Sequence, residues 1–526
     1  MRSGIRTLQI EPEDNVGVVL EAAGSGDALS VVTANGRVGR LVCSDGIPRF
    51  HKVALSRIGK GEPVVKYGSY IGEATSDIEP GEYVHIHNCS SDDACRERHR
   101  NDGAYPPVSV PLASPPGEGQ IQGVAHAPSG ASSEGAAARR WFWGYARQGG
   151  RVGIRNHVLV LPASVCASDV CRMVSDRVPG TVTLHNQSGC SQVDRDRELT
   201  LRTVAGVGAN PNVHSVLVIG LGCEGCQARD VAGAIRSISA KEVRTLVIQE
   251  AGGMSRAVER GVAIAEELVS AARTCKRERF PVSKLVIGTN CGGSDTTSGL
   301  GANPLVGRVS DWLGEVGATS VLCETPELFG AEDALASRAA DPSVAEEIIE
   351  MVRRYERYVA LFGAQMREGN PSPGNIAGGL TTLEEKSLGC VHKGGHGTVN
   401  AAIGYADQIP EASGLVVMDT PGNDPTSVMG LVAGGAQAVI FSTGLGTPTG
   451  NPVVPVLRLT SNPDTAKAMS ECIDFDATEA IFGPRGMGEL ASDLEGALLD
   501  VCDGGEVRAE RQGFVEVALP HLCNYM

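Results

Sequence analysis

The sequence predicts an α/β protein with a small β-rich module at its N-terminus and two parallel-sheet domains after it. Short apolar runs separated by Gly, Asp and Pro fill residues 1–90, a pattern typical of short strands joined by turns. From Trp141 onward, β-branched runs alternate with Gly-rich loops and helical stretches, as in SVLVIGLGCEGCQARDVAGAI. Because strands that alternate with helices form parallel sheets, we expect ligand-binding loops at the carboxyl ends of these strands.

Two changes in composition divide the 526 residues. Residues 91–140 are rich in Pro, Gly, Ser and Ala and lack periodicity, which predicts a flexible linker. The charged stretch TCKRERFPVS, residues 274–283, marks a second boundary. The expected organisation is therefore a module at 1–90, a linker at 91–140, and α/β domains at 141–280 and 281–526.

Charge and composition exclude several classes of function. The formal net charge is −16 and aromatic residues make up 4% of the chain, which disfavours nucleic-acid binding by a basic face or a stacking platform. No apolar run reaches the roughly 20 residues that span a bilayer, and the N-terminal stretch lacks the apolar core of a signal peptide. With these features the 15 cysteines are expected to be reduced thiols in a cytoplasmic protein without a membrane partner.

Reactive residue types gather in glycine-flanked loops. Cys190 lies in HNQSGCSQ, Cys223 and Glu224 lie in GLGCEGCQ, and Cys291 lies in TNCGGSDTTSG. Three cysteines from three such loops could bind one iron or an iron–sulfur cluster. The alternative is that they are small buried residues, a common role of Cys. The pair Cys223-x-x-Cys226 also matches a redox or zinc half-site, but it has no second pair.

Further polar segments follow. The irregular stretch 370–395 is predicted to be functional because long polar loops in compact domains usually are. Its Lys386 and Lys393 could hold a substrate carboxylate or transfer protons, although a single lysine is more often a solvated charge. Near the N-terminus, His85-x-His87 would place both rings on one face of a strand, as a metal pair or as incidental edge residues.

The order of several motifs carries a family resemblance. These motifs are HKVALSRIGKGEPVVKYG, GYARQGGRVGIRNHVLVLP, IGLGCE, NCGGSDTTSGLGANPLVG, ETPELFGAE, NPSPGN, GGLTTLEEKSLG and DTPG. Together they resemble the altronate/galactarate dehydratase family over nearly the whole chain. The resemblance implies a SAF-type β module followed by two Rossmann-like parallel-sheet domains.

The resemblance also implies a reaction and a site. The reaction is dehydration of an altronate-like hexonate or of galactarate to a 2-keto-3-deoxy acid, dependent on Fe²⁺, with Mn²⁺ as a substitute and an iron–sulfur cluster as the alternative. The metal is placed among Cys190, Cys223, Cys291, His85 and His87. Catalytic roles fall to His51, Lys386 and Glu224, with the general base left open. Substrate-binding roles fall to Arg155, Asn156, Ser294, Asp295, Asn303, Asn375, Lys393, Asp419 and Thr443.

One stretch departs from the dehydratase pattern. Leu445 stands where dehydratases commonly carry an Arg, a natural clamp for a second carboxylate. The following GNPVVPVLRLTSNP and the earlier CGGSDTT resemble the large subunit of sulfolactate sulfo-lyase. A C–S lyase acting on a sulfonated 2-hydroxy acid is therefore the alternative function, and a non-catalytic ligand-binding relative is the third. In each case we expect a small-molecule ligand and a homodimer.

Overall fold

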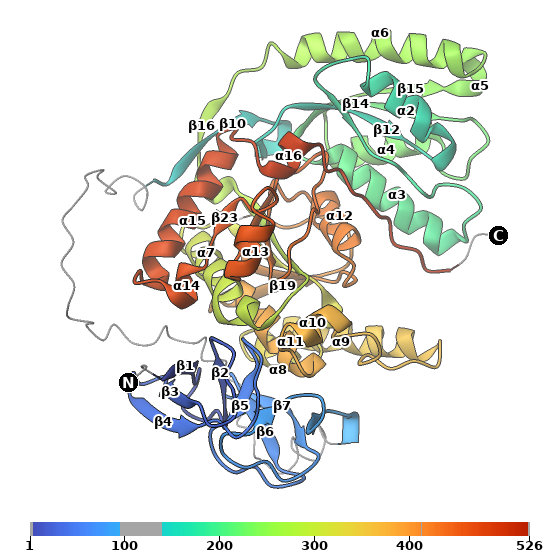
Figure 1. Cartoon of the computed structure of the whole chain (residues 1–526). Helices are drawn as coiled ribbons and strands as arrows, with labels where there is room; N and C mark the ends of the chain where they lie inside the picture. The colour runs from blue at the N-terminus through green and yellow to red at the C-terminus, as the bar shows by residue number, and fades with distance from the viewer. Residues whose placement is uncertain (1–3, 95–138, 412, 524–526) are drawn as a thin grey trace.

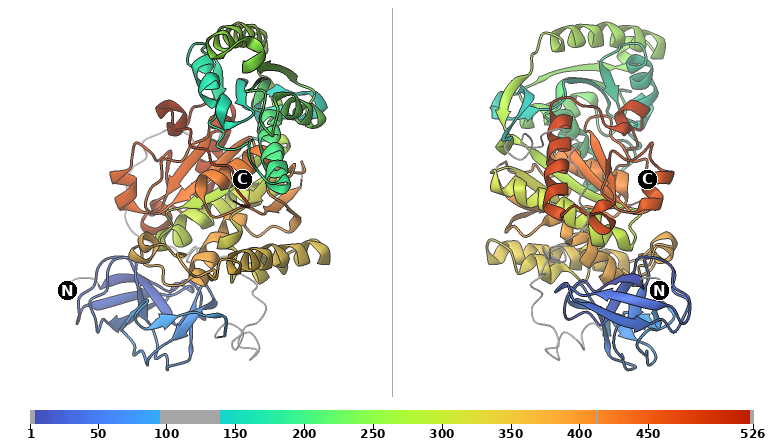
Figure 2. Two further views of the ribbon diagram at one scale, coloured as in Figure 1. Left: turned by 90° about the vertical axis from the view of Figure 1, so that its right-hand side faces the viewer. Right: turned by 60° about the vertical axis from the view of Figure 1, so that its left-hand side comes forward.

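Three bodies are stacked along the molecule, with the C-terminal domain between the other two (Figures 1 and 2). The computed structural model describes residues 4–94, 139–411 and 413–523. Its β-rich N-terminal module and its parallel-sheet domains confirm the predicted fold class. Most of the predicted linker, residues 95–138, lies outside the described residues.

The N-terminal module consists of two small sheets. The larger sheet has the order β4-β3-β1-β2-β5-β8 and the smaller has the order β6-β7-β9. Their pairs are antiparallel except for β1 with β3. The strands are β1 (Ile5–Leu8), β2 (Val16–Val19), β3 (Ala28–Val32), β4 (Val38–Val42), β5 (Lys52–Ala54), β6 (Pro63–Lys66), β7 (Ser69–Ala74), β8 (Tyr83–Val84) and β9 (Cys89–Ser90).

The second domain contains a four-stranded parallel sheet of order β13-β12-β14-β15. Its central strand β14 is buried over almost its whole length, as expected where helices cover both faces of a parallel sheet. The strands are β12 (His157–Pro162), β13 (Thr181–Thr183), β14 (Val213–Gly220) and β15 (Glu242–Val247). The longer helices are α2 (Ser168–Ser175), α3 (Asp194–Ala209), α4 (Ala228–Ile238) and α6 (Met254–Ala272), and α5 (Ile248–Ala251) is a single turn.

The C-terminal domain contains a seven-stranded parallel sheet of order β19-β20-β18-β17-β21-β22-β23. The strands are β17 (Val286–Gly292), β18 (Thr319–Leu322), β19 (Val399–Ile403), β20 (Gly414–Met418), β21 (Ala438–Thr443), β22 (Val456–Thr460) and β23 (Phe475–Asp476). After β17 the chain builds one side of the sheet and then returns to the other side at β21. Ligands of open parallel sheets bind at such a reversal, outside the carboxyl ends of the strands.

Helices of the C-terminal domain lie on both faces of its sheet and at its carboxyl edge. In chain order they are α7 (Asn303–Glu315), η5 (Thr325–Glu327), α8 (Glu332–Ala336), α9 (Pro342–Ala360), α10 (Pro373–Ala377), α11 (Leu383–Val391), η6 (His392–Gly394), α12 (Asp424–Gly434), α13 (Pro463–Ala468), α14 (Glu479–Phe482), α15 (Met487–Cys502) and α16 (Arg508–Gln512). The long helix α9 projects sideways from this edge (Figure 1). Buried residues of α7 and α15 form one core cluster with β17, β21 and β22.

The two parallel-sheet domains are joined by a ribbon and by a shared core. Strand β10 (Trp141–Ala146) pairs with β11 (Val152–Gly153) and with β16 (Glu278–Pro281), so that the two ends of the second domain meet. Phe142 and Ile154 are buried in the core of the C-terminal domain. A further cluster joins apolar residues of α3 and α4 to residues of α12 and β20. This cluster therefore joins the second domain and the C-terminal domain through one apolar core.

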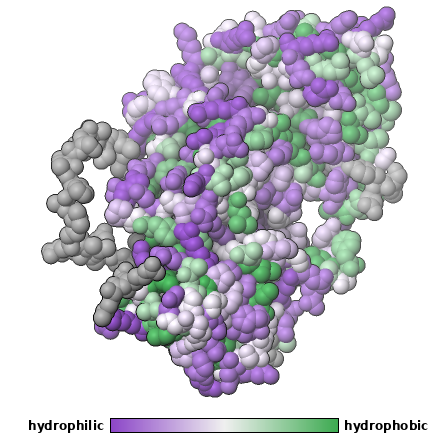
Figure 3. Space-filling model, in the orientation of Figure 1, coloured by the Kyte–Doolittle hydropathy of each residue, from purple (hydrophilic) through white to green (hydrophobic). Residues whose placement is uncertain are grey.

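The surface, the helices and the cysteines each add one observation. Hydrophilic and apolar residues are interspersed over the face in Figure 3. No helix within the described ranges has the length and apolar character needed to cross a membrane. No disulfide joins cysteines in these ranges.

Candidate active site

Two thiols and two carboxylates meet at the carboxyl edge of the large sheet. Cys291, Glu324, Glu327 and Cys390 are all buried, and one ligand atom from each lies within 4.8 Å of the others. The Cys291 Sγ is 3.7 Å from the Cys390 Sγ and 3.2 Å from Glu327 Oε2. No other group of three or more His, Cys, Asp or Glu side chains with this spacing occurs in the described part of the chain. We call these four residues the thiol–carboxylate group.

The large sheet positions two of these four residues, Cys291 and Glu324. Cys291 lies near the end of β17 and Glu324 follows β18, which is the parallel neighbour of β17. Glu324 has a φ of 75°, a left-handed conformation that is uncommon for a residue with a side chain. Its amide donates to Thr420 Oγ1 at 2.8 Å, and its carboxylate accepts a hydrogen bond from the Cys291 amide at 2.9 Å. Strained residues of this kind cluster at functional sites.

Helix α11 and η6 supply the rest of the site. Lys386, Cys390 and Lys393 are spaced by four and three residues, so they share one helical face. The Lys393 Nζ lies 2.8 Å from the Cys291 Sγ, 3.1 Å from the Cys390 Sγ and 2.6 Å from Glu324 Oε2. The Lys386 Nζ lies 2.8 Å from Glu327 Oε1. These buried charges are tolerable because each has an opposite charge in contact.

The two glutamates have opposite pKa shifts. Burial raises the pKa of Glu324 to about 8, against the opposing effect of Lys393. Burial also acts to raise the pKa of Glu327, but the charges of Lys386 and Lys393 lower it overall. Within one cluster, Glu327 is therefore held ionised while Glu324 readily accepts a proton. Carboxyl groups whose pKa values are driven apart are typical of acid–base sites.

Asp424 is a third carboxyl at the same edge. It begins α12 and lies against Gly292, where a Cβ would come 2.2 Å from Asp424 Oδ2. Only glycine at position 292 leaves room for this carboxylate beside the strand that carries Cys291. Burial, with a contribution from the charge of Glu327, raises the pKa of Asp424 to about 7. A group with this pKa can both accept and donate a proton near neutral pH.

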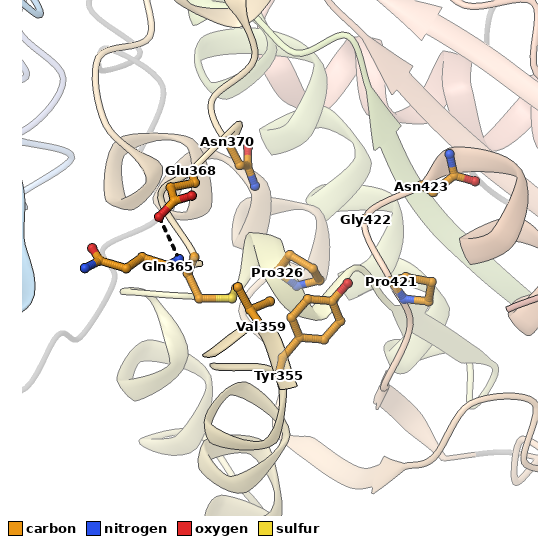
Figure 4. Close-up of a pocket in the computed structure, with 10 residues that line it drawn as sticks. Pro326, Tyr355, Val359, Gln365, Glu368, Asn370, Pro421, Gly422 and Asn423 are labelled. Carbon is orange, nitrogen blue, oxygen red and sulfur yellow. Dashed lines mark hydrogen bonds between the residues drawn. The ribbon is translucent and has the colours of Figure 1, made fainter. Parts of the chain in front are cut away.

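A pocket of about 270 Å³ opens beside this group. Pro326 and Asn423, on its wall, directly precede Glu327 and Asp424 in the chain (Figure 4). The Asn370 Oδ1 accepts a hydrogen bond from the Lys386 Nζ at 2.8 Å, which joins the pocket wall to the site. The remaining wall comes from α9 and the segment after it, namely Tyr355, Val359, Gln365, Met366 and Glu368, and from Pro421 and Gly422.

The donor set of the thiol–carboxylate group fits a single divalent transition metal. Thiolate and carboxylate ligands together suit ions such as Fe²⁺, whereas an iron–sulfur cluster usually takes three or four cysteines. The Lys393 ammonium lies within hydrogen-bonding distance of both sulfurs, so a metal bound to both would displace it. Lys393 could then pair with Glu324 alone.

The N-terminal module reaches the same helix from the other side. Lys52 and Lys66 are buried and both bond Glu385 of α11, with Nζ–O distances of 2.8 and 2.7 Å. These lysines lower the pKa of Glu385 to about 2, against the opposing effect of burial. The module is therefore anchored to the residue that precedes Lys386.

The histidines proposed from the sequence lie at this module interface. The His51 Nδ1 is 2.6 Å from the Tyr83 hydroxyl, and its Nε2 is 3.1 Å from the Ala377 carbonyl oxygen. The His85 Nδ1 is 3.1 Å from Thr381 Oγ1, and burial lowers the pKa of His85 to about 4. His87 is exposed and packs near the Tyr83 ring. None of the three joins the thiol–carboxylate group, and their part in a metal site stays a prediction.

The second-domain cysteines also lie elsewhere. Cys190 and Cys223 follow β13 and β14 at the edge of the smaller sheet, where Cys190 is half-buried and Cys223 is exposed. Glu224 is turned back into its own loop and accepts a hydrogen bond from the Gly222 amide at 2.5 Å. Neither cysteine joins Cys291 in the thiol–carboxylate group, and a site shared by the three stays a prediction. Of the predicted residues, the structure brings together Cys291, Lys386 and Lys393.

Several residues predicted to bind substrate make hydrogen bonds or ion pairs within the protein. Arg155 uses its guanidinium on Glu510 and on backbone carbonyls, and Asn156 bonds Arg147 and the Ala272 carbonyl oxygen. Asp295 accepts hydrogen bonds from Thr297, Ser298 and Asn462. Because these groups are already paired, a substrate would have to break their bonds.

The other predicted binding residues also have partners. Asn303 bonds the Gly389 carbonyl oxygen and Ser442, and Asp419 pairs with Thr325 and Arg354. Asn375 caps α10 and donates to the Ser294 carbonyl oxygen, and Thr443 accepts from the Gly446 amide. Ser294 and Thr443 are buried at the ends of β17 and β21, where the sheet reverses direction.

The sequence left four site residues unassigned: Glu324, Glu327, Cys390 and Asp424. Glu324 and Glu327 lie in the motif ETPELFGAE, and Cys390 lies in the stretch 370–395 that was predicted to be functional. The helical spacing of Lys386, Cys390 and Lys393 was the signal that would have placed Cys390 beside the lysines.

Known families match the three bodies in order. The models match the altronate/galactarate dehydratase SAF domain over residues 5–92, the second domain of D-galactarate dehydratase/altronate hydrolase over 144–273, and the C-terminal domain of D-galactarate/altronate dehydratase over 282–524. Altronate dehydratase of Bacillus subtilis is 33% identical over 97% of this chain and 98% of its own length.

Two further relatives have other names. The (2R)-sulfolactate sulfo-lyase subunit beta of Chromohalobacter salexigens is 38% identical over 73% of this chain and 98% of its own. The subunit alpha of the same organism is 36% identical over 15% of this chain and 85% of its own. The matched models, together with the full-length similarity to altronate dehydratase, show that this chain belongs to the altronate/galactarate dehydratase family of carbon–oxygen lyases.

Proposed function

We propose that this protein is a metal-dependent hydro-lyase that dehydrates a sugar acid, an altronate-like hexonate or galactarate, to a 2-keto-3-deoxy acid. The observation that carries the proposal is the thiol–carboxylate group beside Lys386, Asp424 and the pocket. Such a dehydration needs a base for the proton beside the carboxylate, positive charge for the enediolate, and an acid for the departing hydroxyl. The site contains each type of group.

Each residue has a proposed role. Cys291, Cys390, Glu324 and Glu327 hold Fe²⁺, or Mn²⁺ in its place. A bound divalent ion would supply Lewis acidity toward the substrate oxygens. Lys386, which donates a hydrogen bond to Asn370 of the pocket wall, would bind the substrate carboxylate. Asp424, with a pKa of about 7, takes the proton next to that carboxylate.

The test is a substrate panel. Anaerobically prepared protein with Fe²⁺ and reductant should form 2-keto-3-deoxy product from one or more hexonates, pentonates or hexarates, and a chelator should stop the reaction. Asp424→Asn should abolish turnover while leaving metal content unchanged. Lack of any keto acid across the panel, with the metal bound, would exclude the proposal.

A C–S lyase remains a second candidate because of the sulfo-lyase relatives. The subunit beta relative is 38% identical over 385 residues, whereas altronate dehydratase is 33% identical over 522. The same site could deprotonate a sulfonated 2-hydroxy acid, with sulfite as the leaving group instead of water. The panel should therefore include such an acid and be scored for sulfite as well as keto acid.

We further propose that the protein is a homodimer that pairs through the end of α9. This end carries Tyr358, Leu361 and Phe362, and the last two are 80% and 71% exposed. Leu361→Glu with Phe362→Glu should yield monomers by light scattering, whereas Met254→Glu, at a site 68% exposed on α6, should not.

A further inference from the structure

The two sulfurs of the thiol–carboxylate group are placed for a second kind of chemistry. Cys291 Sγ and Cys390 Sγ are 3.7 Å apart, and both residues are 1% exposed. The other sulfur close to this edge belongs to Cys323, which bonds the Thr289 carbonyl oxygen, Asn290 and Ser427 instead. Cys291 and Cys390 are therefore the pair whose sulfurs could join.

We propose that Cys291 and Cys390 form a reversible disulfide when the site holds no metal, so that oxidation switches off metal binding. This inference rests on the proposed metal site. A disulfide requires the sulfurs to approach to about 2.05 Å, a shift that side-chain rotation must supply. Gly389, the neighbour of Cys390, packs beside Gly299, where an added Cβ would come 3.4 Å from the Gly299 Cα.

The surroundings favour bond formation. The Lys393 ammonium touches both sulfurs, at 2.8 and 3.1 Å, and so stabilises negative charge on whichever one attacks. Glu327 Oε2 lies 3.2 Å from the Cys291 Sγ and accepts a hydrogen bond from its thiol, which orients that sulfur. Without the positive charge of Lys393, negative charge on the two sulfurs would oppose their approach.

The oxidant is a peroxide, and the atoms balance in two steps. One thiol and hydrogen peroxide give a sulfenic acid and water. The second sulfur then attacks the sulfenic sulfur, forming the S–S bond and releasing a second water. Two electrons pass from the two thiols to the peroxide, and a dithiol returns them.

The disulfide would disable the site without unfolding it. Two of the four ligands become a neutral disulfide that binds metal weakly, since thiolate is the ligand form of cysteine. Bound metal should in turn protect the two sulfurs from oxidation. A metal bound to both sulfurs holds their electron pairs and excludes peroxide, so the loaded protein should resist this oxidation.

The experiment compares thiol chemistry in metal-free and metal-loaded protein. Chelator-treated protein receives limiting hydrogen peroxide, is alkylated, and is digested for mass spectrometry. We expect a peptide pair linked through Cys291 and Cys390, a mass loss of 2 Da, and full reversal by dithiothreitol. Protein loaded with Mn²⁺, which reacts far less with hydrogen peroxide than Fe²⁺ does, should give at least tenfold less of the linked pair.

Matched variants make the result decisive. Cys390→Ser should give no linked pair and should leave Cys291 to oxidise further, to sulfinic acid. Cys323→Ser, a buried cysteine in the same region, should form the pair as the unmodified protein does. Circular dichroism and the unfolding temperature confirm that each variant folds.

Two results would overturn the inference. One is absence of the linked pair while other cysteines oxidise, and the second is equal yield with and without metal. Because these readouts are masses, they do not depend on turnover. A linked pair in a protein that fails every substrate in the panel would reject the proposed function and keep the switch.

Discussion

The second and C-terminal domains end their central strands in nearly the same way, yet only one builds a reactive site. In the second domain β14 ends at Gly220, where a Cβ would come 2.2 Å from Glu224 Oε1. In the C-terminal domain β17 ends at Gly292, with Asp424 Oδ2 at the same 2.2 Å. Both loops also carry a cysteine close to that glycine, Cys223 or Cys291.

The difference lies in where the partners come from. Glu224 belongs to the loop itself and bonds its own Gly222 amide. Asp424 arrives with α12, and Cys390, Lys386 and Lys393 arrive with α11 and η6, which the N-terminal module holds through Glu385. Local glycine–cysteine patterns therefore make a loop that can receive a ligand. Distant elements that pack over the loop decide whether it becomes an active site.

The largest expected difference between the two domains is at the cysteines. Cys291→Ser should lower kcat/KM and bound metal by about 100-fold or more, because losing a ligand costs at least as much as losing its supporting partners. Cys223→Ser should change both by less than about twofold, since an exposed residue without a structural partner has little effect. Metal analysis and steady-state kinetics on the two variants measure this. Equal losses would mean that the second-domain loop belongs to the active site.

The anchor of α11 should show the next largest effect, on stability. Glu385→Gln leaves two buried lysines without a countercharge, which should cost about 3–5 kcal/mol. Amide hydrogen exchange of peptides from residues 4–94 should rise, whereas exchange of second-domain peptides should not. Glu479→Gln, which removes an exposed partner of Arg485, should cost about 0–1 kcal/mol.

Low pH should weaken the ion pairs of Glu385 with Lys52 and Lys66. The pKa of Glu385 is lowered to about 2, so its ion pairs stabilise the fold fully above the ordinary value near 4.5 and are lost as pH falls toward 2. Module peptides should therefore gain exchange in this window before the second domain does. Simultaneous loss of protection in both would show that Glu385 does not hold the module.

The same contrast explains how much the sequence could predict. Periodicity predicted the fold class because strands and helices are local patterns. Cys291, Lys386 and Lys393 were found because their segments were unusual. The partners of Cys291 come from 33 to 102 residues away, and no local pattern says which segments will pack over a loop. Cys190 and Cys223 were grouped with Cys291 because their loops carry the same glycine–cysteine signal.

The glycines that end β17 and β14, Gly292 and Gly220, allow a more specific test with a smaller expected loss in kcat. Gly292→Ala should displace the Asp424 carboxylate and lower kcat by about 10- to 100-fold, since misplacing a reacting group by about 1 Å has effects of this size. Gly220→Ala meets Glu224 at the same distance and should leave kcat within about twofold. Both variants carry the same added methyl group and the same crowding of a carboxylate. Similar losses in kcat would indicate a general packing defect and not a role for Asp424.

The smallest effect is the pH dependence that Asp424 should impose. A base with a pKa of about 7 is ionised in about one molecule in eleven at pH 6 and in about ten of eleven at pH 8, so kcat/KM should rise about tenfold between them. Asp424→Asn should give a low and flat profile.

Stability should move in the opposite direction, because the pKa is raised in the folded state. Ionisation of Asp424 costs stability as pH rises from 3.8 to about 7, so Asp424→Asn should resist urea better than the unmodified protein at pH 8 and equally at pH 3.5. A catalytic loss without this gain in stability at pH 8 would place the base at another residue of the site.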